Sequence, residues 1–174
     1  MTGESEAGIR ACGRDDVPGI LAVINDAAEA YRGVIPDDRW HEPYMERAEL
    51  EEALEAGVRF RCREEDGSVV GVMGIQHVED VTLIRHAYVR SDRQGEGIGS
   101  ALLEHLLAGA DRPVLVGTWR AATWAVEFYR SHGFEPVPDP AGRRLLRRYW
   151  SIPERQVETS VVLADRRWRR REEG

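Results

Sequence analysis

The stretch Gln94-Gly95-Glu96-Gly97-Ile98-Gly99-Ser100 joins two apolar segments of different periodicity. Residues 81–89, before it, are typical of a β-strand, and after it apolar residues recur at helical spacing from Ile98 to Leu107. A glycine-dense turn between a strand and a helix leaves backbone N–H groups open to a ligand, because no Cβ atoms cover them. Together with the helix N-terminus, these groups favour an anion, usually a phosphate.

Two common phosphate-binding loops do not fit this stretch. A Walker loop needs a lysine after its last glycine, but all 24 basic residues of this chain are arginine. A dinucleotide-binding loop has the spacing G-x-G-x-x-G and an acidic residue about 20 positions later. Here the glycines follow G-x-G-x-G, and Gly117-Thr118-Trp119 stands where the acidic residue belongs.

A second segment of the sequence indicates which kind of phosphate-binding loop this is. Gln94, Gly97 and Gly99 fit the pattern Q/R-x-x-G-x-G/A, and Trp124 to Phe134 contains A-x-x-F-Y-x-x-x-G-F, with Tyr129 lying 35 residues beyond Gln94. In order and spacing the two segments resemble the GNAT acetyltransferase superfamily, and the resemblance covers roughly residues 8–137. It implies an α/β fold with a mixed central sheet of about six to seven strands and helices on both faces.

The apolar and turn patterns predict elements that agree with this fold class. We expect a single acetyltransferase domain over residues 1–165, followed by a charged C-terminal tail, residues 166–174, that frays. Strands are predicted at 9–12, 58–63, 68–76, 81–89, 114–118, 134–137 and 156–163. Helices are predicted from residue 15 or 16 to Gly33, at 46–56, from the glycine loop to Gly109, at 121–131 and at 143–150.

Composition limits the partners and the location. The formal net charge of −7 argues against nucleic acid as a main partner. No apolar run approaches the ~20 residues that cross a bilayer, so we expect no membrane partner. Cys12 and Cys62 are expected to be reduced, buried thiols, which predicts a cytoplasmic protein. The β-rich run 156–163 leaves a homodimer open, and we assign no metal site.

The resemblance implies that acetyl-CoA is the acyl donor. Its diphosphate would accept hydrogen bonds from the loop, and the pantetheine arm would pair with the strand edge before the loop. The N–H of Val89 would polarise the thioester carbonyl, an oxyanion-type role. The expected cofactor-binding residues are Ala87, Tyr88, Val89, Gln94, Gly95, Glu96, Gly97, Ile98, Gly99 and Ser100. The Glu96 side chain is expected to point to solvent, because a carboxylate repels a diphosphate.

The same resemblance places Tyr129 at the general-acid position, where it would protonate the leaving thiolate. A phenol with a pKa of about 10 suits a thiol leaving group. The alternative role for Tyr129 is packing in the core. The sequence departs from the family pattern at Ala122, where many members have an asparagine that contacts the coenzyme. One contact is therefore missing, or Thr123 supplies it.

The general base is not fixed by the sequence. The family often places an acid or a histidine four or six residues before the Val89 position, but these positions hold Arg85 and Leu83. His86 is a candidate, although it should face the other side of the sheet unless a bulge re-aims it. The other candidates are a water relay to solvent and the side chains of His41, Glu42, His77 and Glu79.

We expect an N-acetyltransferase in which a small-molecule amine attacks the thioester directly. Tyr31, Trp40, His41 and Tyr44 are expected on one side of the acceptor, and Tyr149, Trp150 and Ser151 on the other. Aromatic rings with the acids Asp37, Asp38 and Glu42 suit an amine with an apolar part, whereas Arg85 would suit an acceptor carboxylate. The sequence leaves both open. The alternatives are a protein or peptide N-acetyltransferase and a non-catalytic acyl-CoA-binding module.

Overall fold

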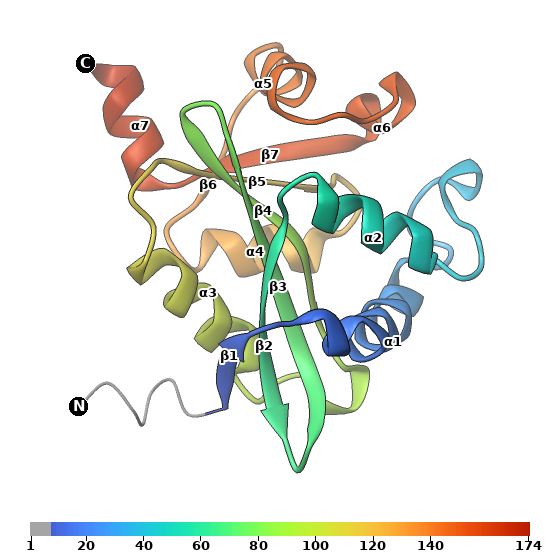
Figure 1. The fold of residues 1–174 in the computed structure, drawn as a ribbon. Coiled ribbons are helices and arrows are strands. Elements are labelled where there is room, and N and C mark those ends of the chain that lie inside the picture. Colours follow the sequence, from blue (N-terminus) through green and yellow to red (C-terminus); the bar gives the residue numbers. More distant parts are fainter. Residues whose placement is uncertain (1–7) are drawn as a thin grey trace.

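The computed structural model describes residues 8–174, which form one mixed β-sheet covered by helices on both faces (Figure 1). The sheet order is β1-β2-β3-β4-β5-β7-β6, and only β4 and β5 run parallel to each other. The strands are β1 (Ile9–Ala11), β2 (Arg59–Glu65), β3 (Ser68–Val78), β4 (Val81–Val89), β5 (Val114–Trp119), β6 (Glu135–Pro136) and β7 (Ser160–Ala164). The predicted fold class is confirmed.

Seven α-helices lie within residues 8–174. They are α1 (Val17–Ala27), α2 (Arg47–Glu55), α3 (Ile98–Ala108), α4 (Thr123–Arg130), α5 (Ala141–Tyr149), α6 (Glu154–Thr159) and α7 (Arg166–Glu173). The apolar periodicity that predicted the first five is matched by their buried faces, for example Ile20, Val23, Ile24 and Ala27 along α1. The Asp66-Gly67 turn joins β2 to β3, as the hairpin signal predicted.

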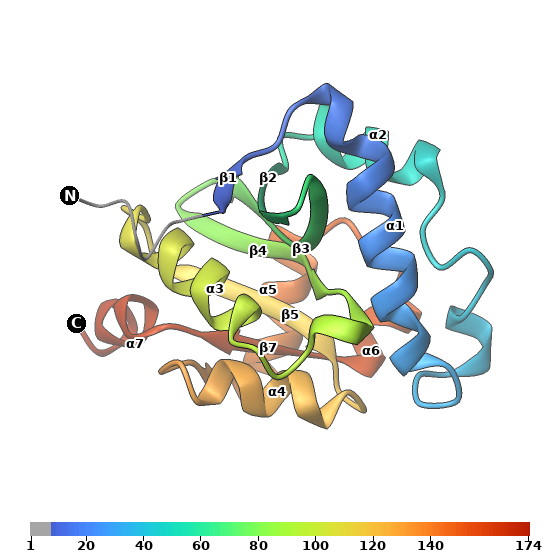
Figure 2. The same ribbon diagram turned by 90° about the horizontal axis from the view of Figure 1, so that it is seen from below.

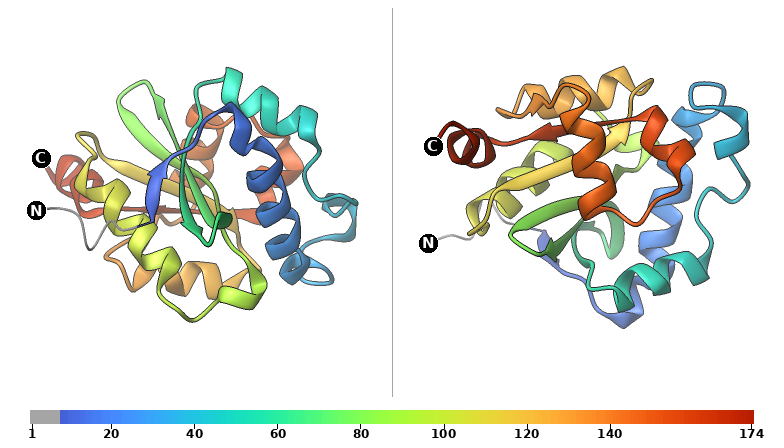
Figure 3. Two further views of the ribbon diagram at one scale, coloured as in Figure 1. Left: turned by 60° about the horizontal axis from the view of Figure 1, so that its bottom comes forward. Right: turned by 90° about the horizontal axis from the view of Figure 1, so that it is seen from above.

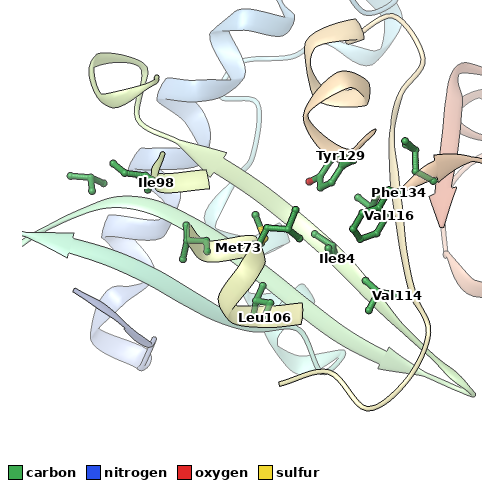
Figure 4. Packing of buried hydrophobic residues seen from close by; sticks show 12 residues of the cluster. Met73, Ile84, Ile98, Leu106, Val114, Val116, Tyr129 and Phe134 are labelled. Carbon is green, nitrogen blue, oxygen red and sulfur yellow. The ribbon is translucent and has the colours of Figure 1, made fainter. Parts of the chain in front are cut away.

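Strand alternation divides the core between the two faces of the sheet. On one face, α3 and α4 cover Ile84, Val114 and Val116 (Figure 4). On the other face, α1 and α2 cover Phe60 and Val72 at the β2–β3 half, and α5, α6 and α7 cover the β5–β7 half. Figure 2 shows α3 and α4 together on one side of the strands. The right-hand view of Figure 3 shows α5 and α6 over one half of this second face, with α1 and α2 beside them over the other half.

The parallel strands β4 and β5 separate part-way along their length. They pair only from Thr82 opposite Val114 to Ile84 opposite Val116. Beyond that point β4 continues along β3 to Val89, while β5 continues along β7 to Trp119. The separation leaves one edge of β4 unpaired over residues 85–89. The gap between the two strands beyond this point is called the passage below.

A β-bulge lies on β4 at the start of this unpaired edge. Val72 pairs with Tyr88 and Gly74 pairs with Arg85, so His86 and Ala87 together oppose Met73. His86 has a φ of 55°, which marks the extra residue. The bulge shifts the alternation of side chains between the two faces of the sheet by one residue. As a result Ala87 and Val89 face α3, and Tyr88 faces α1, on the same face as Arg85.

Two sequence-based expectations for the C-terminal part are wrong. The run 156–163 was expected to be a continuous strand, but α6 extends to Thr159 and only Ser160–Ala164 form β7. Residues 166–174 were expected to fray, but most of them form α7, whose Trp168 is buried. Asp165 begins α7 by accepting a hydrogen bond from the Trp168 N–H at 3.1 Å. This packing holds the segment against β5 and β7.

No helix within residues 8–174 is both long and apolar enough to cross a bilayer.

Cys12 and Cys62 are free thiols. Burial is the main cause that raises the pKa of both.

Candidate active site

Two cavities meet near the point where β4 and β5 separate, and the end of α1 contributes to the first of them. The first, here the α3 cavity, has a volume of about 520 Å³ and lies between α3, α4 and the end of β4. The second, here the α5 cavity, has a volume of about 540 Å³ and lies between the loop before α2, the strands β4 and β5, and α5. Tyr31 and Tyr88 line both cavities. The passage between the strands is therefore where the two cavities come closest.

The glycine loop forms one wall of the α3 cavity. Gly95 and Gly97 have φ values of 80° and 81°, a left-handed conformation that L side chains rarely adopt. Gly97 is the N-cap of α3, and no cap side chain takes up the free N–H groups of the first helical turn. The loop thus presents unprotected amides and the positive end of α3 to the cavity. This arrangement suits a phosphate or diphosphate.

The first turn of α3 packs against both β4 and α4 at Gly99. A Cβ atom at this position would lie 3.4 Å from Phe128 Cζ on α4 and 3.6 Å from Val89 Cγ2 on β4, which are ordinary van der Waals distances. An alanine therefore fits at this position, in agreement with the G/A alternative of the loop pattern.

Ion pairs draw the Glu96 side chain away from the loop amides. Arg93 donates to Glu96 with an Nη2–Oε1 distance of 3.0 Å and also pairs with Glu65 on β2. The hydrogen bond from Arg93 is the main cause that lowers the pKa of Glu96. Glu96 is half exposed, in agreement with the expected orientation, and Arg93 offsets its negative charge beside an anion site.

The backbone of Val89 faces the passage between the strands. Arg90 N–H donates to Val70 O at 2.8 Å, and the next pair along the ladder is Gly71 opposite Val89. Because hydrogen-bonded pairs alternate in antiparallel strands, the Val89 N–H points away from β3. The side-chain amide of Gln94 donates to Val89 O at 3.3 Å, which ties the loop to the end of β4. An N–H in this position can polarise a carbonyl group in the passage.

Aromatic side chains and one arginine line the α5 cavity. Tyr31 and Tyr44 pack with ring centroids 5.5 Å apart, and Tyr31 meets Tyr88 edge-on at 6.2 Å. Trp119 Nε1 donates to the Tyr44 hydroxyl at 3.0 Å. Arg85 Nη1 donates to Gln76 Oε1 at 2.7 Å. Of the residues expected around the acceptor, Tyr31, His41, Tyr44, Asp38 and Trp150 line this cavity.

Other residues expected at the acceptor lie elsewhere. Tyr149 is buried and donates to Asp80 Oδ1 at 2.7 Å, at the far end of the sheet. Trp40 packs on Tyr44 behind the cavity wall, with ring centroids 5.5 Å apart. Neither Ser151 nor Asp37 is among the residues that line the cavity. The structure therefore brings part of the expected set together at the α5 cavity, both from the loop before α2 and from the end of α5.

The phenols between the two cavities are protonated at neutral pH. Burial raises the pKa of Tyr31 to about 12. Burial, followed by the neighbouring phenols Tyr31 and Tyr44, raises the pKa of Tyr88 well above its usual value. The hydroxyl groups can therefore donate hydrogen bonds to a bound carbonyl or amine. They cannot act as bases near neutral pH.

Residues 57–136, which include both sequence motifs, match the family model of the acetyltransferase (GNAT) domain. This match and the fold support the GNAT acetyltransferase superfamily, which the motifs predicted. The enzyme class of the chain is therefore acetyltransferase, as the motifs predicted. No curated protein matches the chain by sequence.

Solved GNAT structures share the fold at low sequence identity. The PaiA N-acetyltransferase of Thermoplasma acidophilum, in complex with coenzyme A, is 15% identical with a TM-score of 0.67, over 90% of this chain and 96% of that one. A GNAT acetyltransferase of Staphylococcus aureus is 15% identical with a TM-score of 0.69, with the same coverage. The ribosomal-protein-S18-alanine N-acetyltransferase of Escherichia coli is 18% identical with a TM-score of 0.62, over 90% and 91%.

The GNAT motif tyrosine, Tyr129, lies at the base of the α3 cavity. Its ring packs edge-on against Phe128 and Phe134, and its hydroxyl lies on the side away from Phe134 (Figure 4). Within residues 8–174 this hydroxyl has no hydrogen-bond partner. Burial raises the pKa of Tyr129, which keeps the phenol protonated. The side chain is thus part of the core and also a free proton donor facing the cavity.

Ala122, the departure from the GNAT pattern, lies outside the α3 cavity. It is fully buried and packs with Ile35 and Trp119. The neighbouring Thr123 does not line the cavity either, whereas Trp124 does and is stacked on Tyr31 at 6.0 Å. Trp124 is the residue that the motif comparison overlooked. Its exposure could not be predicted, because an apolar ring on an amphipathic helix is usually buried.

The base candidates separate into two groups. The β4 bulge places His86 in the α5 cavity, with its ring stacked on Phe60 at 6.2 Å, and His41 lies at the rim of the same cavity. Burial, followed by the charge of Arg85, lowers the pKa of His86 to about 3. His77 instead contacts Thr82 Oγ1 at 2.9 Å, Glu79 pairs with Arg148, and Glu42 pairs with Arg32. These three residues do not line the cavity.

Proposed function

We propose that the chain transfers an acetyl group from acetyl-CoA in the α3 cavity to the amine of a small molecule in the α5 cavity. The observation that carries the proposal is that the two cavities share the lining residues Tyr31 and Tyr88, and that Tyr88 lies on β4 beyond the point where β4 separates from β5. A reaction that joins two substrates needs such a meeting point. Both substrates can be held there in a fixed orientation.

The α3 cavity fits a coenzyme A thioester. The amides of the glycine loop suit the diphosphate, and the unpaired edge of β4 at Ala87 and Val89 suits the amides of the pantetheine arm. Several amides must act together. A hydrogen bond to a charged acceptor contributes about 1.5–3 kcal/mol, whereas micromolar binding needs about 8 kcal/mol. The structural neighbour from Thermoplasma acidophilum, crystallised with coenzyme A, supports this assignment.

The bound coenzyme supplies the acyl group as a thioester. The acceptor nitrogen, once neutral, forms a bond with the acyl carbon, and the carbon–sulfur bond breaks with its electron pair going to sulfur. One proton from nitrogen ends on the thiol, and an ammonium acceptor loses a further proton to solvent. The Val89 N–H would stabilise the developing oxyanion, and Tyr129 would protonate the sulfur and regain the proton that leaves the nitrogen. His86 lies in the α5 cavity, but because its pKa is lowered to about 3 it would pass an ammonium proton on to water and not retain it.

The size of the α5 cavity supports a small acceptor. Its volume of about 540 Å³ falls in the range of about 300–1,000 Å³ that is typical of small-molecule sites. Its walls come from the loop before α2, from both strands and from α5, so an acceptor would be surrounded by aromatic rings. A peptide N-terminus is the second candidate. It would have to enter the same cavity.

The test is release of free thiol by the purified protein from acetyl-CoA during incubation with a broad panel of amines and short peptides. We expect turnover with at least one small amine, and lower turnover when propionyl-CoA or succinyl-CoA replaces acetyl-CoA. Turnover of peptides alone would move the acceptor to the second candidate. Tight coenzyme A binding by calorimetry without turnover of any compound would overturn the proposed reaction.

A cytoplasmic location and a homodimer stay predictions.

A further inference from the structure

Arg85 is a cation without a carboxylate partner in the α5 cavity. Within residues 8–174, no aspartate or glutamate lies within ion-pair distance of its guanidinium, and its hydrogen bond goes to the neutral Gln76 Oε1 at 2.7 Å. Gln76 is itself held, because its Nε2 donates to Ala56 O at 3.0 Å. Two consecutive side-chain contacts therefore fix the guanidinium at the cavity without neutralising it.

The acids of the same cavity have other partners. Asp38 pairs with Arg155 at 3.2 Å and with Arg39 at 3.8 Å. Glu49 is exposed at the start of α2 and accepts a hydrogen bond from the Glu46 N–H at 3.3 Å. Neither acid offsets the charge of Arg85. The wall of the cavity at Arg85 therefore carries one positive charge without an ion-pair partner among the described residues.

Arg85 is partly buried, and a charge removed from water without a counter-charge destabilises the folded protein. Burial lowers the pKa of Arg85, which reports this cost. A neutral side chain could form a hydrogen bond with Gln76 and fill the same space without this cost in stability. The arrangement is instead the one expected when the counter-charge arrives with a ligand, since a guanidinium binds a planar carboxylate through two parallel hydrogen bonds.

The position of Arg85 fits an acceptor that bears both an amine and a carboxylate. Arg85 and Tyr88 point to the same face of β4, and one of the two residues between them is the bulge residue His86. Their side chains therefore start about 7 Å apart, two regular strand steps. Val89, at the passage to the α3 cavity, is the next residue. A small molecule can thus reach the guanidinium with one end and the passage with the other.

We propose that Arg85 binds a carboxylate of the acceptor, so that the acceptor is an amino carboxylic acid rather than a simple amine or a polyamine. This inference rests on the proposed function and names the substrate class of the same site. The carboxylate supplies the missing counter-charge. It also orients the amine toward the thioester.

The test compares matched acceptors that differ only in the acid group: amino acids, their carboxamides and the corresponding decarboxylated amines. We expect kcat/KM from thiol release to be on the order of 100-fold higher for the acid of at least one set. Equal or better turnover of the amides and amines would overturn the assignment of Arg85 and leave the acetyltransferase proposal intact. Calorimetry of the same acids with the coenzyme-A-loaded protein gives a readout that does not need turnover. No binding of any acid would also overturn the assignment.

Variants of Arg85 test the residue itself. Arg85→Gln should lower kcat/KM for the preferred acid by roughly 100-fold, remove the preference over the amide and leave coenzyme A binding unchanged. Arg85→Lys keeps the charge but cannot form the bidentate hydrogen bonds, so it should retain part of the preference for the acid. Arg59→Gln is the matched control, because Arg59 on β2 donates only to the neutral oxygens Leu54 O and Val58 O, each at 3.0 Å, outside both cavities. An unchanged acid preference in Arg85→Gln would overturn the proposal.

Discussion

Trp119 Nε1 donates a hydrogen bond of 3.0 Å to the hydroxyl of Tyr44, which joins the end of β5 to the loop before α2. Both residues line the α5 cavity. Burial raises the pKa of Tyr44, and the phenol accepts from the indole as a neutral group. The hydrogen bond thus fixes the distance between the N-terminal helices and the strand that separates from β4. The shape of the α5 cavity, the proposed acceptor site, depends on this contact.

Removal of this contact should affect both stability and acceptor binding. Tyr44→Phe leaves the indole N–H without its partner, so we expect the free energy of unfolding to fall by about 1 kcal/mol and the KM for the acceptor to rise. Denaturant unfolding and steady-state kinetics measure the two effects. Tyr149→Phe is the control, because it loses a comparable hydrogen bond to Asp80 far from the cavity. Its stability should fall while its KM stays constant. An equal rise of KM in both variants would contradict the local role of Tyr44.

Tyr129→Phe should separate catalysis from coenzyme binding. The substitution removes only the hydroxyl, and the ring contacts with Phe128 and Phe134 remain. If the phenol protonates the leaving thiolate, kcat falls on the order of 100-fold, while the dissociation constant of coenzyme A from calorimetry stays the same. Because burial raises the pKa of Tyr129, a loss of activity between pH 8 and 10 belongs to another group. Parallel losses of turnover and of coenzyme affinity would remove Tyr129 from the acid role.

Gly97→Ala should weaken the anion site through backbone strain. Gly97 has a φ of 81°, and nothing lies within 4 Å of a Cβ atom built there, so strain and not collision is the expected effect. A left-handed alanine costs about 1–2 kcal/mol. We expect a comparable loss in the free energy of unfolding, or a shifted loop with weaker coenzyme A binding. Gly109→Ala, at the other end of α3 with a φ of −91°, is the control and should bind coenzyme A normally. Unchanged stability and affinity in Gly97→Ala would argue against a rigid loop.

The parts of the site that sequence alone predicted depend on short local patterns. The glycine loop and Tyr129 belong to motifs of a few residues each, and they need only a strand before and a helix after them. The alternation of β4 could not be predicted in the same way. That His86 and Tyr88 both reach the α5 cavity depends on the pairing of β4 with Met73 on β3, which the sequence of β4 does not contain. The bulge reverses the orientation of every residue after it.

The C-terminal expectations failed because tertiary packing overrode local preference. The run 156–163 is rich in valine and threonine, which favour strands, yet Val157 is buried with Tyr149 and Trp150 as part of α6. Residues 166–174 are rich in arginine, which suggests an exposed tail. However, the buried Trp168 anchors them, and Asp165, just before this segment, is the N-cap of α7. Contacts with residues distant in sequence determine both outcomes.

His86 should be neutral over the whole range in which the enzyme is assayed. Burial and the charge of Arg85 lower its pKa to about 3, and no acid is among the causes of this shift. In the unfolded chain the pKa of a histidine is about 6.5. Folding therefore disfavours proton binding, and the stability that neutral His86 permits is complete above pH about 6.5 and is lost as pH falls toward 3. His86→Gln should show a smaller loss of stability over that window.

The pKa of His86 also tests the charge of the acceptor site directly. Resonances of the His86 ring in NMR spectra recorded from pH 3 to pH 8 should give a pKa well below 6.5 in the free protein. In Arg85→Gln the pKa should rise, because the second cause of its lowering is gone. His41→Gln, at the exposed rim of the α5 cavity, is the control and should leave the His86 resonances nearly unchanged. A His86 pKa near 6.5 in the unsubstituted protein would mean that water reaches the ring freely, and that His86 is a stronger base than its burial implies.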